Sequence, residues 1–397
     1  MINENTITEM IATGKKSIYW TEINMNLLQE IKESFLKTKP LQGLTIGMCL
    51  HVEPKTAVLC KTLKAGGANV IITGSPGTTK DDVAAAMADE GIKVYGQRSD
   101  GREEHLQNIQ SVLKHHPQIL MDNGADLTRE YIKHYNAEGL IGCTEETTTG
   151  ANLLREDLKG KFPVPIIVIN DSPLKQVIEN EHGVGQTIVQ GFMRTTNLIV
   201  PTKRFVVIGY GTCGRGVARY LRSLGAQVTV VDQNPIAGLE AALDGLRVAR
   251  LEDTLAYGQV FITVTGRPNI ILKEHIDKMN DGAILANAGH FSWEIDLEYL
   301  ESEADTIDRL SPDIEQFTMK DGRRVMLLTK GEMLNLAQEG GGGNPVETMD
   351  LGFALQASSV LYLVKQHAQM ATGPQPVPHE VNIKVASNML KQLSLPL

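Results

Sequence analysis

Residues 203–232 constrain the fold of this chain more than any other stretch. The segment opens with a short, β-branched apolar run that predicts a buried strand rather than a helix. Gly209, Gly211 and Gly214 follow in G-x-G-x-x-G spacing, and a helical pattern and a second strand-like run then lead to Asp232. A strand, a glycine-rich turn, a helix, a strand and an acidic residue in this order predict a β-α-β unit.

Each of the three glycines has its own role in such a unit. One forms the tight turn, one lets the backbone approach a pyrophosphate, and one lets the helix pack on the strand, so that the helix N-terminus can hold the phosphates. Asp232 stands where a carboxylate accepts hydrogen bonds from the adenosine ribose and would repel a 2′-phosphate. The segment therefore predicts a Rossmann domain that binds NAD rather than NADP.

Length and composition set the class of protein. A chain of 397 residues predicts two domains, and its net charge of −9 argues against a nucleic-acid partner. The four cysteines have no CxxC pair and no zinc spacing, so no metal site is expected. The N-terminus lacks a signal sequence, and no run approaches the length of a membrane span. These features predict a cytoplasmic protein with no membrane partner.

Strand-like and helical segments alternate along the whole chain, which predicts parallel sheets with helices on both faces. We expect an α/β fold of two doubly wound domains, with the Rossmann NAD domain inserted in a substrate-binding α/β domain. The expected boundaries are 1–181 for the first part of the substrate domain and 182–344 for the NAD domain with a crossing helix. Residues 345–371 would form a returning helix of the substrate domain, and 372–397 a C-terminal tail.

Polar clusters follow several predicted strands of the first domain. They begin at His51, at Asp122-Asn123, at residues 145–150 (EETTTG) and at Asn170-Asp171. Any one of them could equally be a helix cap or a turn, but ligands of doubly wound sheets bind at the carboxyl ends of strands. Together they favour a site whose carboxylates and hydroxyls would contact a polyol.

Lys175 and Glu179 lie four residues apart after the last of these strands. On a helix they would share a face, and an ordinary surface ion pair is the alternative interpretation.

The strings CLHVEPKTAVL, EETTTGANLL, NDSPLKQVIEN, GYGTCGRG and NAGHFSWEID occur in this order between about residues 40 and 370. In sequence and in order they resemble S-adenosylhomocysteine hydrolase. The resemblance implies a tightly bound, recycled NAD and a redox-assisted elimination. The nucleoside 3′-hydroxyl is oxidised, the C4′ proton is removed, the 5′ substituent leaves, water adds, and the ketone is reduced again.

The resemblance also implies roles for individual residues. His51 would be the acid/base at C4′ and C5′, Lys175 would help to deprotonate the 3′-hydroxyl, and Glu146 would hold the ribose hydroxyls. Glu179 stands where the family more often has aspartate. His290 and Phe291 match a gating pair over the substrate channel.

The implied cofactor and substrate contacts form a larger set. The NAD contacts, beyond the three glycines and Asp232, are Thr147, Thr148, Thr149, Asn180, Thr212, Cys213, Thr265, Asn287, Gly289 and Asn335. The further substrate contacts are Glu53, Lys55 and Asn344. The resemblance implies a homo-oligomer, either a dimer or a tetramer.

The chain departs from the family pattern at three places. The second residue of the family's aspartate pair is Asn123, and an amide cannot take or give a proton at neutral pH. Asn344 replaces a histidine in the loop after the NAD domain, and the tail stops short of a Lys and a Tyr found in many relatives. Glu53 and Lys55 resemble the archaeal type, which includes S-inosylhomocysteine hydrolases.

These departures leave several functions open. The first is hydrolysis of S-adenosylhomocysteine-like 5′-thionucleosides. The second is the same chemistry used by a nucleoside 5′-dehydratase or lyase of a specialised pathway, and another is hydrolysis of S-inosylhomocysteine. The last is a non-catalytic NAD-binding regulator, against which the intact His51, Lys175 and Glu146 argue. Neither the purine base nor the 5′ leaving group follows from the sequence.

Overall fold

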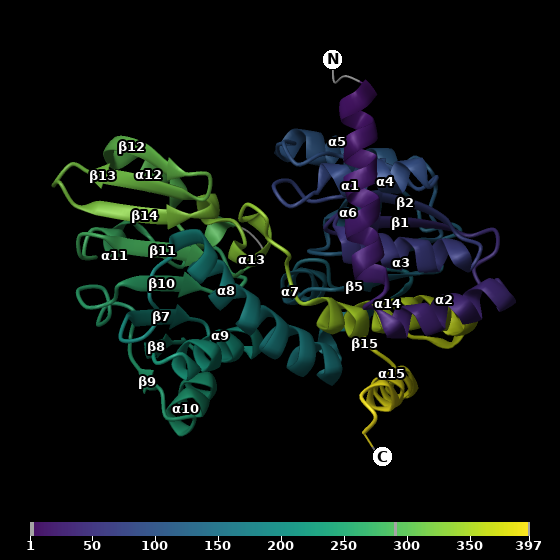
Figure 1. Cartoon of the computed structure of the whole chain (residues 1–397). Helices are drawn as coiled ribbons and strands as arrows, with labels where there is room; N and C mark the ends of the chain where they lie inside the picture. The colour runs from purple at the N-terminus through teal and green to yellow at the C-terminus, as the bar shows by residue number, and fades with distance from the viewer. Residues whose placement is uncertain (1–3, 290–291, 396–397) are drawn as a thin grey trace. The chain divides into compact units, whose positions relative to one another are not determined.

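The computed structural model describes residues 4–289 and 292–395, and the chain forms two compact units. The first unit runs to Lys175 and resumes at Val346, and the second comprises Gln176–Pro345. In Figure 1 the first unit is coloured purple to blue and then yellow, and the second teal to green. No helix in the described ranges is long and apolar enough to cross a membrane.

The first unit is built on a seven-stranded sheet in which neighbouring strands of the described ranges pair in parallel. Its order is β15-β6-β5-β4-β1-β2-β3. The strands are β1 (Thr45–Cys49), β2 (Asn69–Thr73), β3 (Lys93–Tyr95), β4 (Ile119–Asp122), β5 (Gly142–Glu145), β6 (Pro165–Val168) and β15 (Gly373–Pro376).

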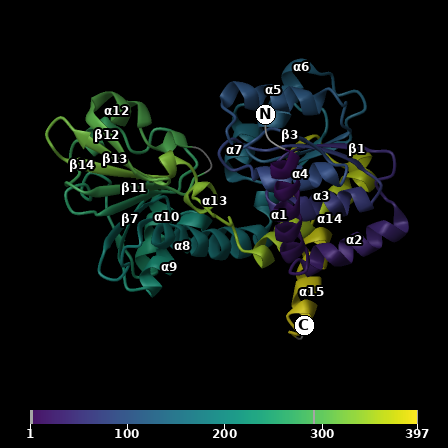
Figure 2. The same cartoon turned by 45° about the horizontal axis from the view of Figure 1, so that its top comes forward.

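Helices cover both faces of this sheet because successive strand residues point to opposite sides. Met48 of β1 packs in one core, with residues of α1 (Glu4–Glu22), α2 (Asn26–Thr38), α3 (Pro54–Ala65), α4 (Asp81–Asp89) and α14 (Val346–Gln366). Its neighbour Cys49 packs in the other, with residues of α5 (Arg102–Leu113), α6 (Asp126–His134) and α7 (Thr148–Glu156). Figure 2 shows these layers from a second direction.

The returning helix α14 joins the C-terminal part of the chain to the N-terminal part. It packs on α2 and α3. Asp350 of α14 accepts hydrogen bonds from the backbone N–H groups of Leu27 and Leu28 at 2.8 and 2.9 Å. These N–H groups belong to the first turn of α2, whose N-cap residue makes no side-chain bond of its own, so Asp350 serves as its cap.

The second unit contains an eight-stranded sheet in the order β12-β13-β14-β11-β10-β7-β8-β9. Read from β9 to β14 this is the strand order of a dinucleotide-binding fold, with a hairpin added at one edge. The strands are β7 (Arg204–Ile208), β8 (Gln227–Val231), β9 (Arg247–Val248), β10 (Val260–Thr263), β11 (Ala283–Asn287), β12 (Ala304–Ser311), β13 (Ile314–Met319) and β14 (Arg324–Leu328).

The helices of this unit include α8 (Gly185–Thr196), α9 (Thr212–Ser223) and α10 (Pro235–Leu243) with one core, and α11 (Lys273–Ile276) and α12 (Leu297–Glu303) with the other. A short α13 (Leu334–Ala337) packs on α8. The predicted α/β class with a Rossmann domain is confirmed.

Three details differ from the sequence-based expectations. The segment 372–397 is not a separate tail, because β15 pairs with β6 and α15 (His379–Gln392) packs on α14 and α2. The single crossing helix expected after residue 182 is a π-helix, η2 (Lys175–Val184), followed by α8. The antiparallel hairpin β12–β13 was not anticipated.

Candidate functional site

Three strands of the first unit place predicted site residues at one edge of the sheet. β1 pairs with β4 and β4 with β5, so that Cys49, Asp122 and Glu145 lie in register. The residues that follow, among them His51 and Asn123, therefore leave the sheet at the same edge, where ligands of doubly wound sheets bind.

Asn123 and Glu146 meet directly at this edge. Asn123 Nδ2 donates to Glu146 Oε2 at 2.9 Å, and both side chains are buried. The backbone N–H of Glu146 also bonds to the carbonyl of Asp122 at 3.0 Å. The amide that departs from the family pattern therefore holds the carboxylate predicted to bind the ribose.

Asp122 and Glu145 precede this pair in the chain and are fully enclosed carboxyl groups. Burial raises the pKa of Asp122 to about 6, against hydrogen bonds from Thr128 that lower it. Burial, and then the charge of Asp122, raise the pKa of Glu145, against hydrogen bonds from Gly124 and Thr147 that lower it. Asp122 is a strand-end anchor whose Oδ2 accepts the Thr128 N–H at 2.7 Å.

His51 is oriented through one ring nitrogen. Its Nδ1 lies 2.8 Å from Thr78 Oγ1, and that hydroxyl donates to the carbonyl of Ser75 at 3.1 Å. A threonine whose proton goes to a carbonyl presents an acceptor to the ring, which favours a proton on Nδ1 and leaves Nε2 as the basic nitrogen.

Glu53 and Lys55 form a buried ion pair at the start of α3. Lys55 Nζ lies 2.8 Å from Glu53 Oε2, and Glu53 also caps the helix by accepting from the Lys55 N–H at 3.2 Å. Lys80 is close enough to interact with both charges, and its own burial lowers its pKa. The pair offers one donor group and one acceptor group side by side.

The threonine run forms the start of helix α7 and is not part of a loop. Thr147 is the N-cap and accepts from the Gly150 N–H at 2.9 Å, while its own hydroxyl donates to Glu145 at 2.7 Å. Thr148 and Thr149 form the first turn. Thr147 is therefore a helix cap, whatever else its backbone contacts.

The remaining strand-end residues of this unit separate into two kinds. Asn170 and Lys175 are buried, and Lys175 is the first residue of η2. Asp171 instead pairs with Arg155 at the surface and does not join the cluster.

In the second unit the glycine-rich turn has the geometry that its spacing predicts. Gly209 has a φ of +107°, which disfavours any side chain. A Cβ on Gly214 would collide with the carbonyl of Gly209, so this glycine allows the helix to pack on the strand. A Cβ on Gly211 would meet nothing within 4 Å, which leaves open space at the N-terminus of α9. The turn fits a pyrophosphate.

Asp232 ties the end of β8 to this turn. Its Oδ2 accepts from the N–H of Tyr210 at 2.6 Å, and its Oδ1 accepts from the N–H of Asn234 at 2.8 Å. Each oxygen keeps further acceptor capacity for ribose hydroxyls. Thr212 and Cys213 begin α9, and Asn180 Nδ2 donates to Thr212 Oγ1 at 3.4 Å.

A polar network joins three predicted residues that are far apart in the sequence. Asn344 Nδ2 donates to Glu179 at 3.3 Å, and Asn335 Nδ2 donates to Asn344 at 3.1 Å and to Thr187 at 3.0 Å. The Oδ1 atom of Asn335 is buried without a hydrogen-bond partner in the described ranges. An orphaned acceptor fits an amide donor such as the nicotinamide carboxamide.

The ends of β10 and β11 are fixed by internal hydrogen bonds. Asn287 is fully buried, donates to the carbonyl of Gly331 at 2.9 Å and accepts from the Gly289 N–H at 2.7 Å. Thr265 donates to Glu294 at 2.7 Å through its hydroxyl. The backbone N–H of Gly266 also donates to Glu294 at 2.8 Å, and burial raises the pKa of Glu294.

The predicted gating pair His290 and Phe291 lies outside the described residues. Within the described ranges no group of three His, Cys, Asp or Glu side chains could hold a metal ion.

Sequence reasoning missed three residues of these sites. Thr78 orients His51, Thr187 joins the asparagine network, and Glu294 holds Thr265. Glu145 lay in the predicted polar cluster of residues 145–150, but no individual role was predicted for it.

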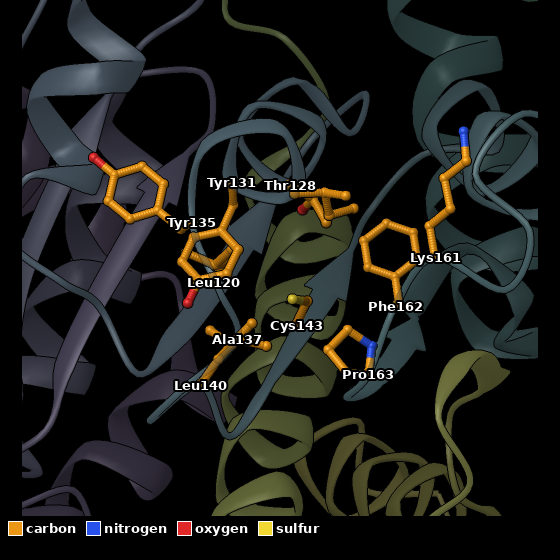
Figure 3. Close-up of a pocket in the computed structure, with 11 residues that line it drawn as sticks. Leu120, Thr128, Tyr131, Tyr135, Ala137, Leu140, Cys143, Lys161, Phe162 and Pro163 are labelled. Carbon is orange, nitrogen blue, oxygen red and sulfur yellow. The ribbon is translucent and has the colours of Figure 1, made fainter.

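A cavity of about 130 Å³ lies elsewhere in the first unit (Figure 3). Leu120 and Cys143 line it from the sheet, and Tyr131 and Tyr135 stack beside it with ring centroids 5.3 Å apart. None of its lining residues belongs to the predicted site.

Comparisons with known proteins cover nearly the whole chain. Residues 6–140 match the family described as S-adenosyl-L-homocysteine hydrolase, and residues 180–341 match its NAD binding domain. An S-inosyl-L-homocysteine hydrolase of Methanopyrus kandleri is 46% identical over 389 residues, which are 97% of this chain and 91% of that protein. An adenosylhomocysteinase of Sulfurisphaera tokodaii is 43% identical over 384 residues, or 96% and 92% of the two chains.

Among solved structures, a dipicolinate synthase of Bacillus halodurans aligns with a TM-score of 0.50 at 14% identity. The alignment covers 82% of this chain and 99% of that one, and it reflects the fold alone.

Proposed function

Because this chain belongs to the S-adenosyl-L-homocysteine hydrolase family, we propose that it hydrolyses 5′-thionucleosides of homocysteine with a tightly bound, recycled NAD. The family establishes an NAD-dependent enzyme that processes nucleosides.

One observation of the structure carries the proposal furthest. Glu146, a buried carboxylate, is held by Asn123 at the same sheet edge from which His51 emerges. A carboxylate accepts two ribose hydroxyls well, and an imidazole can move protons near neutral pH.

Under this proposal the residues of the first unit bind the sugar and move its protons. Glu146 accepts hydrogen bonds from the ribose, and Lys175 takes the proton of the 3′-hydroxyl. His51 removes the C4′ proton and serves the 5′ position through Nε2, since Thr78 occupies its Nδ1. Asn123 carries no titratable proton, so proton transfer at C5′ falls to His51.

The residues of the second unit fit the cofactor. The turn of Gly209, Gly211 and Gly214 would hold the pyrophosphate, Asp232 the adenosine ribose, and the orphaned Oδ1 of Asn335 the carboxamide. When bound, NAD supplies the acceptor for the 3′ hydride and returns that hydride at the end of the cycle.

The Glu53–Lys55 pair would contact the purine base. Hypoxanthine presents an N1–H donor beside an O6 acceptor, whereas adenine presents an amino donor beside an N1 acceptor. A carboxylate next to an ammonium group matches either edge, in opposite orientations. S-inosylhomocysteine is therefore the second candidate substrate, compatible with this ion pair and favoured by the archaeal relatives that carry that name.

The test is thiol release from S-adenosylhomocysteine and S-inosylhomocysteine by the purified chain, followed with a thiol reagent. We expect homocysteine from at least one of them, loss of at least a hundredfold in kcat/KM for Glu146→Gln, and NAD recovered by mass spectrometry after denaturation. No thiol from either substrate, with NAD present, would contradict the proposal. A nucleoside product lighter by the mass of one water would instead indicate the dehydratase.

A further inference from the structure

Glu145 is a buried carboxyl group that the proposed mechanism does not use. It ends β5, lies in register with Asp122 of β4 and has 1% of its surface exposed. Four hydrogen-bond donors from two separate loops converge on it, and none of them is a lysine or an arginine side chain. Such a concentration of neutral donors on one buried carboxyl group requires an explanation.

The first loop that it holds carries Asn123. Glu145 accepts from the backbone N–H groups of Gly124 and Ala125, each at 3.0 Å. Both residues have left-handed backbones, with φ values of +95° and +63°. For Ala125 this conformation is unfavourable, because its Cβ crowds the backbone, so the loop needs an external partner to keep it.

The second loop carries Glu146. Glu145 accepts from the backbone N–H and from the hydroxyl of Thr147, both at 2.7 Å. Thr147 in turn caps α7. Glu145 therefore fixes both the residue that directly follows Glu146 and the start of the helix.

Gly150 leaves room for this arrangement. A Cβ at that position would collide with the carboxyl group of Glu145. Gly150 lies in a helix and its backbone conformation does not require glycine. A larger residue is excluded because the Glu145 carboxyl group occupies the space that its side chain would fill.

We propose that Glu145 is the positioning residue of the substrate site, which braces both loops so that Asn123 meets Glu146 and the Glu146 carboxylate faces the ribose. The bracing follows from contacts within the first unit. The consequence for the ribose rests on the function proposed above.

The first test is Glu145→Gln. Its amide nitrogen would face an N–H donor of one loop, since an amide has one acceptor oxygen where the carboxylate has two. We expect KM to rise ten- to a hundredfold and kcat to change less than threefold. Glu145→Asp keeps the charge with a shorter reach and should recover part of the loss.

The matched control is Asp350→Asn. Asp350 is also a buried carboxyl that accepts two backbone N–H bonds in the same unit, but it caps α2. It should leave KM unchanged. Gly150→Ala displaces the Glu145 carboxyl without altering its charge, and it should raise KM as Glu145→Gln does even if the latter folds poorly.

Amide hydrogen exchange gives a readout independent of turnover. Glu145→Gln should speed exchange at Gly124, Ala125 and Thr147 at least tenfold, and Asp350→Asn should not. If the wild type releases no thiol, the proposed function fails while this readout still decides the bracing. Unchanged exchange at these positions, or a KM within twofold of the wild type in folded Glu145→Gln and Gly150→Ala, would overturn the inference.

Discussion

The Asn123–Glu146 contact makes the substitution Asn123→Asp an informative perturbation. From the sequence alone, a carboxyl at this position is expected to raise thiol release, because it restores a titratable group near C5′. The structure adds a second effect, since the amide nitrogen lies 2.9 Å from Glu146 Oε2. Two carboxylates at that separation cannot both be ionised without strong repulsion.

The magnitude follows from the distance. At an effective dielectric constant of about 20, two unit charges 2.9 Å apart repel each other by about 6 kcal/mol. This corresponds to about four pKa units, and side-chain rotation would relieve part of it. Starting from an ordinary carboxyl pKa of about 4, we expect the pair to lose its second proton with an apparent pKa of about 6–8.

The assay is the pH dependence of kcat/KM between about pH 5.5 and 9.5, a range that brackets the expected ionisation. Below the new pKa the shared proton keeps the pair singly charged, and thiol release should exceed that of the wild type. Above it, the doubly charged pair should bind the ribose poorly, and kcat/KM should fall about tenfold per pH unit. Asn123→Ala, which removes the amide and adds no charge, should show no new ionisation. Profiles of Asn123→Asp and Asn123→Ala that coincide would refute the electrostatic reasoning.

Three further predictions concern the cofactor and stability. Gly214→Ala places a Cβ against the carbonyl of Gly209 and should reduce the NAD recovered per protein chain at least tenfold, as measured by mass spectrometry; full retention would show that the turn can shift. Asn335→Ala removes the unpartnered acceptor together with the amide donor that bonds Thr187 and Asn344, and it should speed NAD dissociation; an unchanged dissociation rate would contradict the carboxamide contact. Burial raises the pKa of Asp350 from 3.8 to about 6, so the unfolded chain loses this proton first as the pH rises. The stability of the wild type relative to Asp350→Asn should therefore fall by about 2 kcal/mol between about pH 4 and pH 6.5 in urea unfolding, and a pH-independent difference would contradict that pKa.

The core of the fold could be predicted because its strands are buried on both faces. Apolar runs such as Phe205–Ile208 and Ile119–Met121 have no other place in a folded chain than the middle of a covered sheet. The edge strands of the two sheets contain no such apolar runs. Strand β12 exposes nearly all of its residues and reads as a polar segment, so the hairpin was missed. Strand β15 contains Pro374 and Pro376, which only an edge strand tolerates.

In the candidate site, residues at strand ends could be predicted from the sequence, but their hydrogen-bond partners could not. The strand-end rule predicted that His51, Asn123 and Glu146 lie near one another, because each closely follows a buried strand, and the three strands do end in register. Their partners come from elsewhere in the chain: Thr78 lies 27 residues from His51. Thr187 lies 148 residues from Asn335, and no local pattern marks it as a site residue. Hydrogen-bond partners are set by how loops fold back, which residue spacing does not encode.

Asn123 shows why a departure from a family pattern needs geometry to interpret. Judged by its chemistry alone, the amide is a loss, because it removes a proton donor from the vicinity of C5′. Judged by its contact, it is a permanent donor to Glu146 that needs no proton of its own and does not change with pH. An aspartate at the same place could make that contact only while one carboxyl of the pair stays protonated. Under the proposed function, a fixed donor in place of a titratable group would let Glu146 bind the ribose over a wider pH range and would leave proton transfer to His51.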